Sequence, residues 1–301
     1  MNLSGVTIAC FASSYAVSLA LEVASLRRRF GWHRMVMLVF AAIGVVLHLV
    51  YLVNLAQGAV TPLASPAEWY LMVALVLAGL YLWGSFRWPH LTLGIFLLPL
   101  VIVLVAVGWG ASREPFTAQR ASLVWGQVHA WSLVLATVTM CVGFAAGLMY
   151  LVQSWRLKQK LAASPRFRLP SLELLERINS HSLGLSTALV AGGFASGLAL
   201  VSLRHQGEAN YSLLADPVVL GLAAMQLWLL AAEVFRWIYP SARRGRKVAY
   251  LTLASFGFLV IALGAMLRTS SVHQAEGQLS VVSGQVPSAS GGNANSFTTD
   301  H

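Results

Sequence analysis

Long apolar runs alternate with short polar stretches along almost the whole of this chain. Each run approaches the roughly 20 apolar residues that an α-helix needs to cross a bilayer core about 30 Å thick. Backbone groups in lipid have to be paired within their own segment, so helices are expected rather than open strands. The pattern predicts eight spans, over residues 5–25, 35–57, 69–86, 91–110, 127–154, 180–203, 216–238 and 248–268.

Composition agrees with this pattern. The chain has 57% hydrophobic and 10% charged residues and a mean hydropathy of +0.71, whereas about a quarter of the residues of a soluble domain are charged. We therefore expect an all-α, polytopic membrane helix bundle of about eight transmembrane helices. Residues 1–273 would form this integral membrane domain, multi-pass in the cell inner (cytoplasmic) membrane. Residues 274–301 are rich in Ser, Gly and Asn, which predicts a disordered extracytoplasmic tail.

Basic residues are concentrated in alternate loops. Sixteen of the twenty Lys and Arg residues fall near residues 27–34, 87, 156–177 and 236–247. Short loops rich in Lys and Arg stay in the cytoplasm, so this bias predicts that both termini are extracytoplasmic. Insertion topology and anionic headgroups also explain the net charge of +10. No nucleic-acid partner is expected, and the lipid bilayer is the partner that the composition predicts.

Histidines carry the candidate chemistry. The predicted topology puts His129, at the mouth of the fifth span, and His273, just after the eighth, on the same outer face. Two neutral imidazoles that face each other can hold a haem iron from both sides, and the flanking Trp125 and Trp131 would pack against the porphyrin. Trp and His are also common at membrane interfaces for packing reasons alone, so both interpretations stay open. His48 lies within the second span, where a polar ring is costly and is either a ligand or hydrogen-bonded to a neighbouring helix.

Residues 123–273 resemble the cytochrome c assembly family of the CcsA and HemX type. The resemblance rests on the order of four segments: WGQVHAWSLVLATVTMCVGFAAGLMYLVQSWRLK, LPSLELLERIN, TALVAGGFASGLAL, and RRGRKVAYLTLASFGFLVIALG leading to His273. It implies that His129 and His273 are external axial ligands of haem iron, and that His48 matches an early intramembrane histidine of the family. The implied cofactor is non-covalent b-type haem, held stably or in passing.

The chain departs from the family in two places. The outer loop after the glycine-rich span reads RHQGEANYSLLADP and lacks a tryptophan-rich motif ending in Trp-Asp. The following span carries Glu233 and Arg236 where the family has a second intramembrane histidine. These departures favour the HemX-like branch. We expect a protein that passes haem to an apocytochrome c or to other cytochrome c maturation membrane proteins, and that is no catalyst of thioether formation on its own.

Two other functions stay open. The chain can instead be a HemX-like regulatory or scaffolding membrane subunit of tetrapyrrole metabolism that acts through its cytoplasmic loop 155–178. A small-solute transporter is the third alternative, ranked lowest because unwound Gly/Pro pairs in matching halves and intramembrane charges are scarce.

Three local features predict packing. Segment 170–178 has apolar positions at helical spacing, which predicts a short amphipathic helix on the cytoplasmic surface. Gly193 and Gly197 predict a close helix–helix contact of the small-xxx-small kind. Glu233 and Arg236 are expected to pair, because residues at this spacing are neighbours on one helix.

Overall fold

The computed structural model describes residues 7–27, 32–57, 63, 65–113, 124–160, 167–204, 217–239 and 245–264, and within these ranges the regular structure is helical throughout. The helices are α1 (Ile8–Ser25), α2 (His33–Gln57), α3 (Pro66–Arg87), α4 (Gly94–Gly110), α6 (Val124–Lys158), α7 (Leu172–Arg204), α8 (Pro217–Ile238) and a last helix, Arg246–Gly264. Seven of these described helices are long and apolar enough to cross a membrane, and α4 is a shorter apolar helix. The all-α architecture and its compatibility with a multi-pass membrane bundle are therefore confirmed.

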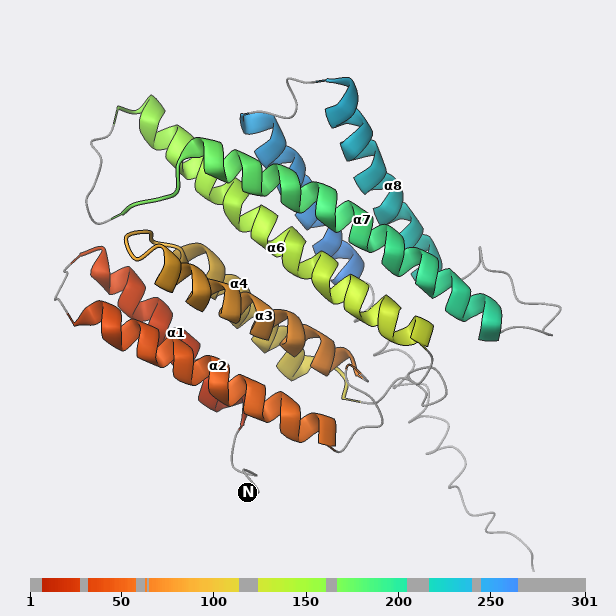
Figure 1. Ribbon diagram of the computed structural model, residues 1–301, viewed down its shortest axis with the longest axis horizontal. Coiled ribbons are helices and arrows are strands. Elements are labelled where there is room, and N and C mark those ends of the chain that lie inside the picture. The colour runs from red at the N-terminus through yellow and green to blue at the C-terminus, as the bar shows by residue number, and fades with distance from the viewer. Residues whose placement is uncertain are drawn as a thin grey trace, which may run out of the picture.

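The helices form two groups that share α6 (Figure 1). Helices α1 to α4 pack on one another and on one side of α6, around a core that includes Phe11, Tyr81 and Val138. Helices α7, α8 and the last helix surround a second core, which includes Met140 and Leu229. The α6–α7 pair is the most extensive helix–helix interface in the described chain. Helix α6 thus contributes buried residues to both cores.

Hydrogen bonds between loops and helix ends gather the basic residues at one end of the bundle, which we call the basic end. Arg34 donates to the Ser85 carbonyl at 2.6 Å, and the Thr92 N–H donates to the Arg168 carbonyl at 2.9 Å. On the other group of helices, Arg246 donates to the Ser154 hydroxyl at 2.8 Å. The loops that the sequence pattern placed on one side therefore do lie together.

Exposed tryptophans lie near both ends of the bundle. Near the basic end lie Trp32, Trp155 and Trp237, and near the opposite end lie Trp109 and Trp125. About half or more of the surface of each is exposed. Tryptophan prefers the two interfaces of a membrane, where its apolar ring and its N–H are both accommodated. The two bands of tryptophan are what a bundle spanning a bilayer would carry.

The start of α7 corrects the predicted surface helix at 170–178. Helix α7 begins at Leu172 and continues to Arg204 without a break, so this segment is its first part. Ser171 caps the helix, since its hydroxyl accepts the Leu174 N–H at 3.3 Å. The apolar positions of this part pack against the remainder of the bundle, as fully buried Leu175 shows. That packing favours one continuous helix over a separate one lying on the surface.

Candidate functional site

His129 lies near the start of α6, at the end of the bundle opposite the basic end. Its Nδ1 is 2.7 Å from the carbonyl oxygen of Gly193 on α7. A carbonyl oxygen only accepts hydrogen bonds, so Nδ1 carries the proton. In the neutral ring, Nε2 then carries the lone pair. A histidine whose Nδ1–H is held by a backbone carbonyl has the tautomer and the fixed orientation of a metal ligand.

The glycines of α7 make room for this imidazole. A Cβ at Gly197 would lie 3.0 Å from both Cε1 and Nδ1 of His129, and a Cβ at Gly193 would lie 2.7 Å from Cδ2 of Leu133. Both glycines therefore face α6, which confirms the predicted close contact of the small-xxx-small kind. Without Cβ atoms at these positions, the Gly193 carbonyl can approach the ring.

The two tryptophans beside His129 differ in their position on α6. Trp125 precedes it by one turn and lies on the same side of the helix, whereas Trp131 lies about 200° around the axis. Trp125 is 49% exposed and Trp131 is 39% exposed, so each indole keeps a free surface. Of the two, Trp125 is placed to flank a flat ligand bound at Nε2 of His129.

His273, the expected second axial ligand, lies outside the described residues. Within the described ranges, no three side chains of His, Cys, Asp and Glu come together as a group that could hold a metal ion. Of the predicted outer pair, the structure describes the surroundings of His129 alone.

His48 lies in the other group of helices and is completely buried. Its Nδ1 is 3.3 Å from the hydroxyl oxygen of Tyr15 on α1, and its ring stacks on Phe11 at a centroid distance of 4.1 Å. Nε2 has no hydrogen-bond partner among the described residues. His48 was expected to be either a ligand or hydrogen-bonded to a neighbouring helix. The described residues provide such a hydrogen bond at Nδ1 and none at Nε2.

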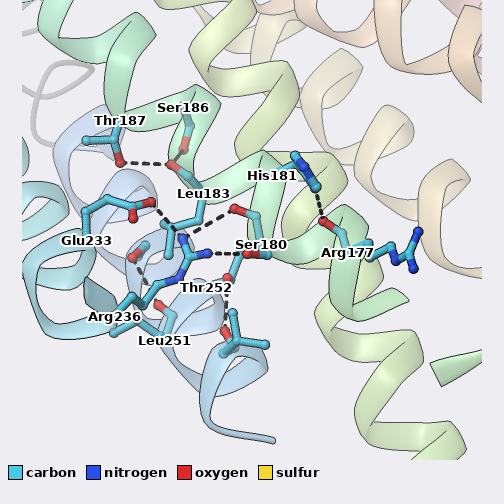
Figure 2. A network of polar contacts seen from close by, with 12 residues as sticks. Arg177, Ser180, His181, Leu183, Ser186, Thr187, Glu233, Arg236, Leu251 and Thr252 are labelled. Atoms are coloured by element: carbon cyan, nitrogen blue, oxygen red, sulfur yellow. Dashed lines mark hydrogen bonds and ion pairs between the residues drawn. The ribbon is translucent and has the colours of Figure 1, made fainter. Parts of the chain in front are cut away.

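The predicted Glu233–Arg236 pair forms near the basic end, where it joins α8 to α7 (Figure 2). The guanidinium donates to Glu233 at 2.7 Å, to the Ser180 carbonyl at 3.3 Å and to the Ser180 hydroxyl. Its side chain is 8% exposed and that of Glu233 is 20% exposed. These contacts link α8 to α7.

Glu22 is a buried carboxylate that the sequence pattern did not single out. Its Oε2 accepts a hydrogen bond from the Tyr81 hydroxyl at 3.0 Å, and its Oε1 accepts the Gly94 N–H at 2.9 Å. It therefore caps the start of α4, where the helix dipole favours a negative charge. A lone acidic residue in the first apolar run and a glycine opening the fourth were the available signals.

His48 and His129 each have a ring nitrogen held by a partner on another helix, one in each group. No family model, no curated protein and no solved structure matches the chain, and its function is inferred below from its own geometry.

Proposed function

We propose that this chain is a membrane haem-handling protein of cytochrome c biogenesis. It holds b-type haem non-covalently at the outer face, with His129 and His273 as the two axial ligands of the iron. The haem is cargo, passed on to an apocytochrome c or to another cytochrome c maturation membrane protein. The chain supplies binding and orientation, and the thiols for any covalent attachment belong to the acceptor.

The geometry of His129 carries this proposal. The hydrogen bond from Nδ1 to the Gly193 carbonyl holds the proton away from Nε2 and fixes the plane of the ring. Such a partner raises the basicity of the ligating nitrogen and reduces the cost of ordering it on binding.

The surroundings of His129 are suited to a flat, largely apolar ligand. Trp125 offers a half-exposed indole on the same side of α6, and aromatic rings stack well on extended π-systems. His129 itself is only partly buried. A ligand bound at Nε2 can therefore be reached by an acceptor protein from outside the bilayer, as delivery of haem requires.

Absorption spectroscopy of the detergent-purified protein tests the proposal. The oxidised and reduced spectra of the wild type are expected to show six-coordinate haem, and the His129→Ala, His273→Ala double variant is expected to lose that signal. His181→Ala is the matched control, because His181 is exposed near the basic end and bonds the carbonyl of Arg177 on its own helix at 2.7 Å. A wild type that stays haem-free in the presence of excess haem would overturn the proposal.

A regulatory or scaffolding subunit is the second candidate, and one observation favours it. The described part of loop 155–178 is held in place at the basic end: Arg156 donates to the Phe167 carbonyl at 3.2 Å and lies 5.0 Å from the centroid of its ring. A basic segment with a fixed backbone is a surface on which a partner enzyme of tetrapyrrole metabolism can dock. Arg156→Ala, Arg168→Ala would then abolish regulation of that enzyme, while loss of His129 would leave it unchanged.

A further inference from the structure

We propose that His48 is the hydrogen-bond donor of an intramembrane binding site for a quinone-type lipid. In this site, Nε2–H of His48 donates to a ring carbonyl of the ligand. The inference is independent of the haem site at His129, from which it differs in helix group, in depth and in tautomer.

Counting hydrogens decides the tautomer of His48. Tyr15 has His48 Nδ1 as its one hydrogen-bond partner among the described residues. If the phenol donates to Nδ1, Nε2 carries a proton, and that proton alone lacks a partner. If Nδ1–H donates instead, the phenol proton and the Nε2 lone pair both lack one. The first arrangement leaves fewer buried polar groups unpaired, and it also uses the stronger proton donor of the two.

The Nε2–H of His48 is a buried donor for which the described residues supply no acceptor. His48 has no exposed surface, so neither water nor lipid reaches Nε2 from outside. An unsatisfied polar group in the bilayer core opposes folding, so an acceptor bound at Nε2 would remove this cost. Nε2 bound to iron would need the opposite tautomer, with the proton on Nδ1. The observed partner therefore favours a ligand that accepts a hydrogen bond.

The packing around His48 holds the ring in one orientation. Gly44 lies one turn before His48 on α2, and a Cβ there would be 2.7 Å from Cε1 of Tyr15. The glycine thus lets the Tyr15 ring lie against α2 and reach Nδ1. Phe11 stacks on one face of the imidazole with an interplanar angle of 6°, and Tyr51 lies 5.6 Å from Phe11 between centroids.

Depth and lining indicate the class of ligand. His48 lies in the interior of α2, well away from both ends at His33 and Gln57, whereas phospholipid ester carbonyls stay at the interface. A charged ligand would pay a high desolvation cost at this depth. The neighbouring side chains Tyr15 and Tyr51 are aromatic and favour a flat ring. A quinone combines a flat ring, carbonyl acceptors without charge and solubility in the bilayer core.

Phe11 is the side chain whose movement would admit a ligand to His48. Phe11 lies one turn from the first residue of α1 and covers the imidazole face. Rotation of this ring toward the helix end would give a ligand from the bilayer access to His48. Phe11→Ala is therefore expected to increase the quinone affinity.

Photolabelling of the full chain in lipid nanodiscs tests the proposal, with an azido-benzoquinone bearing a short alkyl tail as the probe. Wild-type protein is expected to be labelled on α1 or α2, in competition with a decyl-benzoquinone but not with added phospholipid. His48→Phe keeps a ring against Phe11 and removes the donor, so the affinity should fall about tenfold or more. Its thermal midpoint should stay close to that of the wild type, because the variant loses the unpaired N–H of His48 but leaves the buried Tyr15 hydroxyl without its partner.

Further variants keep the test decisive. Tyr15→Phe removes the group that holds the proton on Nε2 and should reduce labelling by a smaller factor, whereas His48→Gln retains an N–H donor and should bind better than His48→Phe. Ser13→Ala, an exposed position on α1, is the control that leaves labelling unchanged. Labelling that persists in His48→Phe overturns the proposal, as does competition by phospholipid or haem. The His129→Ala, His273→Ala variant should keep quinone labelling, so failure of one proposal is distinguishable from failure of the other.

Discussion

His48 and His129 contain the same imidazole, and the atom beside Nδ1 gives them different chemistry. In the second group of helices, Nδ1 of His129 faces the Gly193 carbonyl, which can only accept, and Nε2 keeps its lone pair. In the first group, Nδ1 of His48 faces the Tyr15 hydroxyl, which can donate, and in the arrangement proposed above Nε2 then carries the proton. The comparison teaches that the partner of Nδ1 determines whether Nε2 of a buried histidine carries a lone pair or a proton.

The two groups also differ in how they hold a buried carboxylate. Glu22 is held by neutral donors, the Tyr81 hydroxyl and the Gly94 N–H. Glu233 is held by the cationic Arg236. In the first group the hydrogen bonds of the carboxylate depend on close backbone approach, and in the second they depend on a direct ion pair. A substitution that blocks the backbone approach should therefore lower the free energy of unfolding through the first group, and one that removes the cation should lower it through the second.

The largest effect is expected for Gly94→Ala in the first group. An added Cβ would lie 1.8 Å from Oε2 of Glu22, so the carboxylate has to leave its two donors. We expect the free energy of unfolding to fall by about 3 kcal/mol, from overpacking together with the buried acceptor left unpaired. Thermal unfolding in detergent measures this. The control Gly79→Ala has open space around its Cβ and should not be destabilised; equal losses for both would show that the Glu22 contact contributes nothing.

Arg236→Ala should have the next largest effect and test the charge in the second group. It leaves Glu233, 20% exposed, without its cation and removes the contacts to Ser180. Because the pair keeps some exposure, the expected loss is about 2 kcal/mol, below the range for fully buried pairs. Arg177→Ala removes the exposed pair with Glu173 and should cost about 0.5 kcal/mol at most. Similar thermal midpoints for the two variants would contradict this account.

Gly197→Ala tests whether the orientation of the His129 ring matters for haem binding, and it leaves the histidine itself in place. The new Cβ would lie 3.0 Å from Nδ1 and Cε1 of His129 and should push the ring from the Gly193 carbonyl. If His129 binds haem iron in its present orientation, haem affinity should fall by about tenfold, or 1.4 kcal/mol. Haem titration followed by absorption checks this. Gly221→Ala, where nothing lies near the added Cβ, should titrate like the wild type.

The smallest expected effect is a difference in haem affinity between variants of the two tryptophans of α6. Trp125 shares the His129 side of the helix, so Trp125→Leu should weaken haem binding by a factor of about two to five, roughly 0.5–1 kcal/mol for lost aromatic stacking. Trp131→Leu is the matched variant on the other side of α6 and should bind haem as the wild type does. Equal haem affinities in the two variants would remove Trp125 from the site.

The sequence by itself determined the helical membrane architecture, the gathering of basic loops at one end and the Gly193–Gly197 contact. These are local properties: the length of an apolar run, the charge of a loop and the spacing of small residues on one helix. It was wrong about a separate helix at 170–178, because tertiary packing makes this segment the first part of α7.

Only the tertiary structure decided which groups meet. The partners Tyr15 and His48, Glu22 and Gly94, and His129 and Gly193 are far apart in sequence and come from different helices. Helices that are apolar on nearly every side carry little information about their rotation or depth in the bundle. Those two quantities set whether Nδ1 faces a carbonyl or a phenol, and so which chemistry each histidine offers.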